Sequence, residues 1–191
     1  MSRIVVTGLG VISALGSSVA ENRDALLRSV CGLSSLELFK TKYSDLLRFG
    51  EVKITNDQLK NLYGITDKGV TRTSLLAIKA MDEALKDSQL TRSQYASYDT
   101  ALIVGNTVGG MCLTDELYQD ANNKVEGSAY ISSYDCGSIT LYLQNKYDIK
   151  GVCNTINTAC SSSANAIMFG ARLIKSNYAK RAIVGGVDSL A

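Results

Sequence analysis

Histidine and proline are both absent from this 191-residue sequence. Average usage of about 5% would give roughly ten prolines in a chain of this length. The lack of histidine has chemical consequences, because it excludes Ser-His-Asp triads, Cys-His pairs and histidine-ligated metals formed by this chain itself. Any step that needs histidine must therefore use a residue from another polypeptide segment.

The sequence also lacks an excess of charge of either sign. It has 20 basic and 18 acidic residues, a net charge of +2, and 46% hydrophobic residues. This composition excludes an intrinsically disordered chain and argues against a nucleic-acid-binding surface. No apolar run approaches the ~20 residues of a transmembrane helix, and the N-terminus lacks the continuous apolar core and cleavage site of a signal peptide. We expect a protein of the reducing cytoplasm.

Cysteine is present in an odd number, and no two cysteines form a Cys-x-x-Cys pair. The five are Cys31, Cys112, Cys136, Cys153 and Cys160. A disulfide framework needs an even number in a secreted context, and a structural zinc site needs closely spaced thiolates or histidines. The cysteines therefore predict neither disulfides nor a metal centre.

Short apolar segments alternate with amphipathic ones, which predicts an α/β fold with a mostly parallel sheet whose strands are buried on both faces. Irregular segments are expected at 31–46 and 122–133. Strands are expected at 3–12, where a glycine-rich turn ends the segment, and at 100–104, 151–157 and 181–187, with a strand or extended arm at 47–54. Helices are expected at 21–30, 67–87 (capped by Thr66 or Asp67), 113–121, 135–147 and 161–176.

The length predicts one domain over residues 1–191. The sequence ends four residues after the last predicted strand. A parallel sheet normally continues through another helix or hairpin, so we expect the architecture to continue beyond this chain.

Cys160 lies where a predicted strand turns directly into a predicted helix, in the segment Asn157–Asn165 (NTACSSSAN). A helix N-terminus presents unpaired N–H groups and a partial positive charge, which stabilise a thiolate. The small residues that follow leave room for a substrate, and the N–H group of Cys160 can serve as an oxyanion donor. The spacing alone leaves two interpretations open, a nucleophile or a buried cysteine that acts as a small hydrophobe.

Two glycine-bearing segments resemble nucleotide-binding loops only in part. After Gly8 and Gly10, Ser13 stands where a dinucleotide fingerprint requires a third glycine, so a turn at a strand end is the preferred interpretation. The loop Gly105–Gly110 (GNTVGG) lacks the Gly-Lys-Ser/Thr of a phosphate-binding loop. Its glycines are expected to permit close backbone approach to a neighbouring strand or ligand. The sequence therefore predicts no bound cofactor.

The order of these segments resembles the N-terminal half of the β-ketoacyl synthases, the elongating condensing enzymes of bacterial fatty-acid and polyketide synthesis. The strongest match is NTACSSSANAIMFGARLIKSNYAKRAIVGGVDSLA, which covers the turn with Cys160, the next helix and the next strand. The segments RIVVTGLGVISALG, LRFGEVKI, SLLAIKAMDEALKDSQL and ALIVGNTVGG match earlier parts of the family in the same order. The resemblance extends over essentially the whole chain.

The resemblance implies the N-terminal half of a thiolase-like fold, a five-layered αβαβα sandwich made of two similar halves. It implies that Cys160 takes an acyl group from acyl carrier protein. Malonyl carrier protein then loses carbon dioxide, and its carbanion attacks the thioester. Val108 matches a position that lines the acyl pocket, and Tyr130 or Ile131 falls near a pocket-gating position at the dimer interface.

The implied partners are acyl carrier protein, the C-terminal half of the synthase in the same or another chain, and a second subunit in a homodimer or heterodimer. We expect a homodimer to pair through the strand that leads to Cys160. A basic group on or before the long predicted helix is either an ordinary solvated face or a docking patch for the acidic carrier. Its members are Lys60, Lys68, Arg72 and Lys79.

Departures from the family pattern keep other functions open. Ala14 and Val152 replace two usual prolines, which changes turn rigidity more than chemistry. Two catalytic histidines, a lysine and a glycine-rich phenylalanine loop belong to the family's C-terminal half, which this sequence lacks. The chain is therefore a fragment, one part of a split enzyme, or an inactive truncated relative. A non-catalytic partner subunit is the rival function, and a dinucleotide-binding domain is disfavoured by Ser13.

Overall fold

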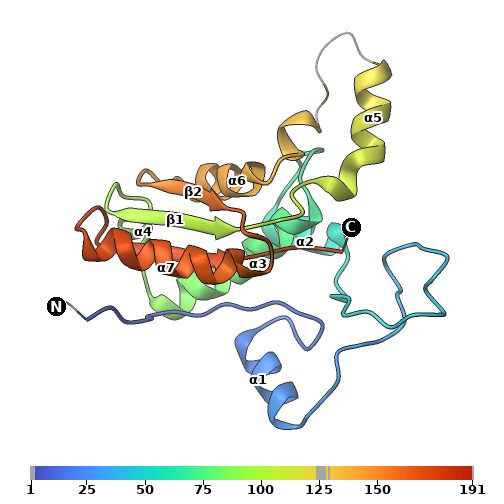
Figure 1. The fold of residues 1–191 in the computed structure, drawn as a ribbon, viewed down its shortest axis with the longest axis horizontal. Helices are drawn as coiled ribbons and strands as arrows, with labels where there is room; N and C mark the ends of the chain where they lie inside the picture. Colours follow the sequence, from blue (N-terminus) through green and yellow to red (C-terminus); the bar gives the residue numbers. More distant parts are fainter. Residues whose placement is uncertain (1–2, 124–127, 129, 191) are drawn as a thin grey trace.

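The computed structural model describes residues 3–123, 128 and 130–190, and a three-stranded parallel sheet lies at the centre of this part (Figure 1). β1 (Thr100–Gly105) lies between β2 (Cys153–Ile156) and β3 (Arg181–Gly186). Every residue of β1 is buried, whereas β2 and β3 form the two partly exposed edges. The prediction of a parallel sheet around apolar strands is confirmed.

Helices cover both faces of this sheet, as predicted. α7 (Ser162–Lys175) packs along β1 and β3 on one face, where Gly170 lets the helix approach β3 closely. α3 (Arg72–Ser88) and α6 (Gly137–Tyr147) pack together on the other face and share a buried apolar cluster with Leu102 of β1. Successive side chains of β1 therefore point alternately into two helical layers.

The five expected helices are all present, with their ends shifted. α3 shows the largest shift, because it begins at Arg72 rather than Asp67. Its N-cap is Thr71, whose Oγ1 accepts the N–H of Ser74 at 2.9 Å, so the expected cap at Thr66 or Asp67 is wrong. The extended backbone of Thr71 directs its hydroxyl to the open end of the helix. The other expected helices are α1 (Val19–Leu27), α5 (Thr114–Asn123), α6 and α7.

Two short helices, α2 (Asn56–Tyr63) and α4 (Arg92–Tyr95), are additional to the expected ones. α2 begins with a capping box, in which Thr55 and Gln58 hydrogen-bond reciprocally, and at the start of α4 the side chain of Gln94 accepts the N–H of Thr91 at 2.8 Å. The sequence signals for the two helices are Thr55 with Gln58 and Thr91 with Gln94. Throughout the described part of the chain, every helix is too short or too polar to span a membrane.

The N-terminal segment 3–12 is not the buried strand that the sequence predicts. It pairs with none of the described strands, and Val5 and Val6 are mostly exposed. It lies instead along α3, where the N–H of Leu9 donates to Asp87 and the N–H of Val11 donates to Glu83, each at 2.9 Å. Because carboxylates of a helix satisfy these N–H groups, the segment is held without a strand partner.

Residues 47–54 form an extended arm, one of the two expected alternatives, with only an isolated bridge between Ser34 and Phe49. Arg72, in the first turn of α3, holds this arm against the helix. Its guanidinium donates to the carbonyl oxygens of Val52 at 2.7 Å and Ile54 at 3.0 Å. The guanidinium of Arg72 therefore has a structural role in the fold.

Glu51 anchors the middle of this arm, with only 3% of the residue exposed. Its carboxylate accepts the N–H groups of residues 37–39 and forms an ion pair with Lys53 at 2.8 Å. Burial by itself raises the pKa of Glu51, but the hydrogen bonds from Lys53 and from these N–H groups outweigh burial and lower the pKa to about 2.

We expect the free energy of unfolding to decrease as the pH falls from about 4.5 to about 2, by up to ~3 kcal/mol from Glu51 alone. A carboxyl whose pKa is lowered by folding stabilises the protein above its unfolded pKa and loses this contribution as it takes up a proton. Urea unfolding at several pH values measures the effect. Glu51→Gln should lower the free energy of unfolding at neutral pH and make it depend less on pH between about 4.5 and about 2. In Glu37→Gln, which changes an exposed carboxylate of the same cluster, the decrease at acid pH should remain.

Candidate active site

Cys160 lies at the junction of β2 and α7, as the sequence predicts. The chain leaves β2 at Ile156, forms a single 3₁₀ turn over Ala159–Ser161, and enters α7 at Ser162 (Figure 1). Cys160 is in the middle of this turn and is exposed. The preceding Ala159 has a φ of 51°, in the left-handed region that a residue with a Cβ rarely adopts. Such strained residues cost about 1–3 kcal/mol and cluster at functional sites.

Hydroxyl side chains hold the turn in this conformation. Ser162 Oγ accepts the N–H of Thr158 at 2.9 Å and donates to the carbonyl oxygen of Ala159 at 2.8 Å. Ser161 Oγ donates to the carbonyl oxygen of Thr158, also at 2.8 Å. Asn165, one turn into α7, donates to Thr158 Oγ1 at 2.7 Å. The small residues near Cys160 thus fix the backbone of the turn through their hydrogen bonds.

Glycine at the end of β1 brings the sheet against this turn. A Cβ on Gly105 would lie 2.6 Å from the carbonyl carbon of Ser162 and 2.7 Å from the backbone nitrogen of Ser163. Real Cβ atoms essentially never approach this closely. The glycines of the Gly105–Gly110 loop were expected to permit a close backbone approach, and at Gly105 the neighbour is the start of α7.

We expect Gly105→Ala to destabilise the protein by about 1–3 kcal/mol, because the new methyl group forces the start of α7 away from β1. Gly185→Ala is the matched control, since a Cβ there meets no atom within 4 Å. Chemical denaturation of both variants measures the difference. Equal stabilities for the two variants would contradict the close approach of β1 and α7.

The loop that carries Val108 contacts the turn that carries Cys160. Thr107 Oγ1 lies 3.5 Å from the carbonyl oxygen of Ala159 and 3.5 Å from Ser162 Oγ. Val108 is the next residue, is partly exposed, and donates its N–H to Asp188. The structure therefore brings the backbone of Val108 close to the turn, whereas its role in an acyl pocket stays a prediction.

The segment with Tyr130 and Ile131 reaches the same loop from the other side. Tyr130 is partly exposed, and Ile131 is 64% exposed at the start of the single turn Ile131–Ser133. A few residues later, the carbonyl oxygen of Tyr134 accepts the N–H of Gly110 at 2.8 Å. The gating role implied for Tyr130 or Ile131 also stays a prediction.

The other thiols have different surroundings from Cys160. Burial raises the pKa of Cys112 and of Cys153, which keeps these two side chains in the less reactive thiol form. Cys136 is partly exposed, and its Sγ donates to the carbonyl oxygen of Thr107 at 3.3 Å. Cys31 is exposed like Cys160 but lies on an irregular segment after α1. Exposure at a strand-to-helix turn therefore distinguishes Cys160 from the other four cysteines.

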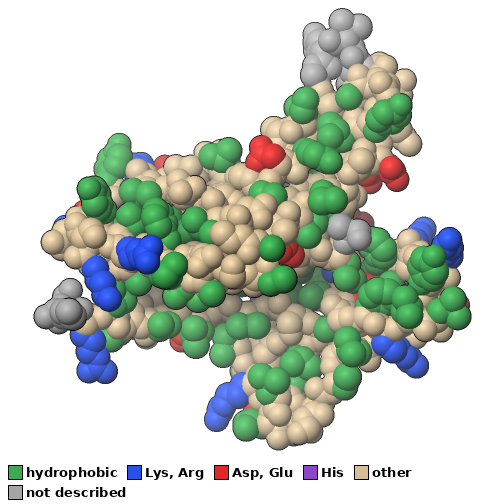
Figure 2. All heavy atoms as spheres, viewed as in Figure 1, with side chains coloured by type: hydrophobic (Ala, Val, Ile, Leu, Met, Phe, Trp, Pro, Cys, Tyr) green, Lys and Arg blue, Asp and Glu red, His purple; other side chains and the backbone are tan. Residues whose placement is uncertain are grey.

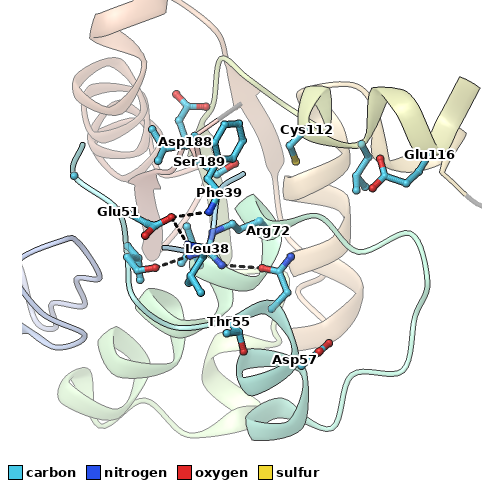
Figure 3. A pocket seen from close by; sticks show the side chains of 16 residues that line it. Leu38, Phe39, Glu51, Thr55, Asp57, Arg72, Cys112, Glu116, Asp188 and Ser189 are labelled. Atoms are coloured by element: carbon cyan, nitrogen blue, oxygen red, sulfur yellow. Dashed lines mark hydrogen bonds between the residues drawn. The ribbon is translucent and has the colours of Figure 1, made fainter. Parts of the chain in front are cut away.

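Three pockets of the described residues lie away from Cys160. One, of about 380 Å³, lies between α3, the 47–54 arm and residues 188–190, and Figure 3 shows Arg72 and Cys112 in its wall. Two others, of about 530 and 660 Å³, lie beside residues 8–14 and 64–70. The four candidate site residues line none of these pockets. Within the same described part, no group of three or more His, Cys, Asp or Glu side chains is placed to hold a metal ion.

Comparison with known families identifies the chain. Its sequence matches the family of the β-ketoacyl synthase N-terminal domain over residues 1–191. The chain belongs to this family. The chain is 26% identical over 195 residues to 3-oxoacyl-[acyl-carrier-protein] synthase 1 of Buchnera aphidicola, covering 100% of the chain and 48% of that protein. It is 28% identical over 195 residues to synthase 2 of Coxiella burnetii, covering 97% of the chain and 45% of that protein.

The chain spans about half the length of these two curated relatives. It is also 33% identical over 155 residues to probable polyketide synthase 25 of Dictyostelium discoideum, which covers 78% of this chain and 6% of that protein. The resemblance to the β-ketoacyl synthases of fatty-acid and polyketide synthesis is thus confirmed.

Solved structures confirm the thiolase-like fold of the ketosynthase domain. The ishigamide ketosynthase/chain length factor superposes with a TM-score of 0.80 at 22% identity, covering 98% of this chain and 47% of the other. A type II polyketide synthase ketosynthase with its acyl-carrier protein superposes with a TM-score of 0.73 at 21% identity, covering 98% and 50%. At these identities the likeness applies to the fold alone.

Proposed function

We propose that this chain is the nucleophile-bearing half of a β-ketoacyl-acyl-carrier-protein synthase and that Cys160 forms its acyl-enzyme. The observation that carries the proposal is the position of Cys160, exposed on a strained turn between β2 and α7. Family membership over residues 1–191 supports a nucleophilic role for a cysteine at this position. Because the chain spans about half of its curated relatives, the complete reaction requires the other half.

The proposed first step is acyl transfer to sulfur. The Cys160 thiol loses its proton to water, its thiolate attacks the acyl thioester carbonyl and forms a new C–S bond, the C–S bond to the carrier breaks, and the carrier leaves as a thiolate that takes up a proton from water. The N–H of Cys160 is one donor to the developing oxyanion, and Val108 with Tyr130 or Ile131 would contact the acyl chain. In the second step malonyl carrier protein loses carbon dioxide, and its carbanion attacks the acyl group and releases Cys160. The donors for that step are two histidines, which must come from another segment.

Two surfaces of this chain are suited to binding a partner protein. β2 is an edge of the described sheet, and its backbone is open to pairing with a second subunit next to Cys160. α7 exposes Ile167 and Met168, and Figure 2 shows hydrophobic side chains over the face that α7 occupies. The solved neighbours include a ketosynthase in complex with its chain length factor and a ketosynthase with an acyl-carrier protein. We therefore propose a second synthase subunit and an acyl carrier protein as partners.

The basic group offers the carrier a smaller surface than the sequence suggests. The guanidinium of Arg72 donates to Val52 and Ile54 of the arm and to Asn56 at the start of α2. Lys68 is exposed, and Lys60 and Lys79 are partly exposed. Docking of an acidic carrier protein to this basic group would therefore depend on Lys60, Lys68 and Lys79.

The alternative function is a non-catalytic partner subunit or an inactive remnant. The complete lack of histidine favours it, as do neighbours that pair a ketosynthase with a chain length factor. Such a subunit would bind a synthase and would take up no acyl group on Cys160.

Acyl uptake decides between the two functions. The purified chain is incubated with an acyl carrier protein that bears a short acyl group, and its intact mass is measured. The proposal predicts the addition of one acyl group that hydroxylamine removes, as expected for a thioester. An unmodified mass together with tight binding to a complete synthase would favour the partner subunit.

A further inference from the structure

One carboxylate oxygen gathers three donors from the loop that follows β1. Asp188, just after β3, accepts the Nδ2–H of Asn106 at 2.8 Å, the N–H of Thr107 at 3.0 Å and the N–H of Val108 at 2.9 Å, all on Oδ1. Asn106 and Asp188 are 82 residues apart in the sequence. Hydrogen bonds to an ionised carboxylate are shorter and stronger than neutral ones. The carboxylate therefore ties the end of β3 to the loop.

Asn106 completes this arrangement from inside the protein. The side chain is fully buried, donates to the carbonyl oxygen of Val187 at 2.6 Å, and accepts the N–H of Gly109 at 2.7 Å. Asn106 and Asp188 together, which we call the loop clamp, thus hold three consecutive backbone N–H groups, from Thr107 to Gly109. The loop lacks regular secondary structure over these residues, so the clamp takes the place of a strand or helix ladder.

The clamped loop lies between the segments that form the proposed site. Thr107 contacts the turn of Cys160 through Ala159 and Ser162. Gly110 is hydrogen-bonded to Tyr134, a few residues after Ile131. A shift of the loop would therefore move Val108 relative to the turn that carries Cys160 and to the segment that carries Ile131.

We infer that Asp188 is a positioning residue that sets the place of Val108 and thereby selects which acyl chains Cys160 accepts. This inference rests on the proposed function, because it concerns the same site. Asp188 is exposed and lies outside the apolar cluster that unites α3, α6 and β1. Its removal should therefore release the loop while the core of the sheet and helices stays folded. Figure 3 shows Asp188 at the edge of the pocket beside Ser189.

The first test is acyl-chain selectivity. Short-chain and long-chain acyl pantetheine thioesters are offered to the full chain, and the acylation rate constant for each is measured by intact mass. In Asp188→Ala the ratio of the two rate constants should change by about tenfold, a change comparable to that caused by one methylene group in an apolar pocket. Asp188→Asn keeps an acceptor oxygen and should restore most of the original ratio. Asp99→Ala, which removes a half-exposed carboxylate just before β1 that pairs with Lys180 next to the start of β3, is the matched control.

The second test is hydrogen exchange at the loop, which needs no substrate. The amides of Thr107 and Val108, which donate to Asp188, should exchange at least about tenfold faster in Asp188→Ala than in the unmodified chain or in Asp99→Ala. An unchanged selectivity ratio in an Asp188→Ala chain that is still acylated would overturn the inference, whatever the exchange rates. If the unmodified chain takes up no acyl group, the proposed function is overturned, and the selectivity role of Asp188 with it. The hydrogen-exchange rates would then show only whether Asp188 holds the loop.

Discussion

The 191-residue chain, assayed alone with acyl and malonyl carrier proteins, is expected to form no detectable β-ketoacyl product. Condensation requires donors aimed at the oxygen of the malonyl thioester while carbon dioxide leaves and negative charge develops there. Each such donor is commonly worth about a hundredfold or more in rate, and the family uses two histidines for this purpose. The sequence contains none. Surface lysine or serine side chains cannot replace groups that are held in a dry, shaped cavity.

Product analysis by mass spectrometry checks this expectation. Addition of a polypeptide that carries the two histidines of the second half should restore product formation, and the same polypeptide with both histidines replaced should not. Robust product from the purified chain alone, with contaminating synthase excluded by mass, would contradict both the mechanism and the half-enzyme interpretation.

The second large effect is expected from replacement of the nucleophile. Cys160→Ala should abolish uptake of the acyl group, because no other group on the turn can form the thioester. Removal of a nucleophile from such a site typically lowers the rate by several orders of magnitude. Cys31→Ala removes a thiol that is also exposed, from an irregular segment, and should leave acyl uptake unchanged. Time courses of intact mass for both variants and the unmodified chain measure the difference.

Comparable acylation of Cys160→Ala and the unmodified chain would place the reactive thiol elsewhere. The stability of Cys160→Ala should stay close to that of the original chain, since the side chain is exposed and the turn is held by Ser161 and Ser162. Loss of acylation in a folded variant can therefore be assigned to chemistry.

Periodicity was sufficient to predict the elements around the site. The continuous apolar run of β1 and the helical spacing within α3 and α7 are local patterns, and the structure contains all three. Cys160 was placed correctly, at a strand-to-helix turn, because the change of pattern at Asn157 is also local.

The segment 3–12 shows where such patterns fail. An apolar run forms a strand only where its backbone pairs with another strand, and here the carboxylates of Asp87 and Glu83 accept the N–H groups of the segment instead. The loop clamp could not be predicted for a similar reason. Asn106 and Asp188 are unremarkable polar residues until the parallel pairing of β1 and β3 brings their neighbouring residues together.

The measurement that tests the central claim most directly is the identification of the cysteine that carries the acyl group. The folded chain is acylated from acyl carrier protein under conditions that add one group, digested at low pH to preserve the thioester, and mapped by peptide mass spectrometry. The account predicts that the acyl group is found on the peptide with Cys160, and that the peptides with Cys112 and Cys153 remain free, because burial keeps those two thiols protonated. An acyl group found mainly on Cys31, Cys112, Cys136 or Cys153 would contradict the assignment of Cys160 as the nucleophile.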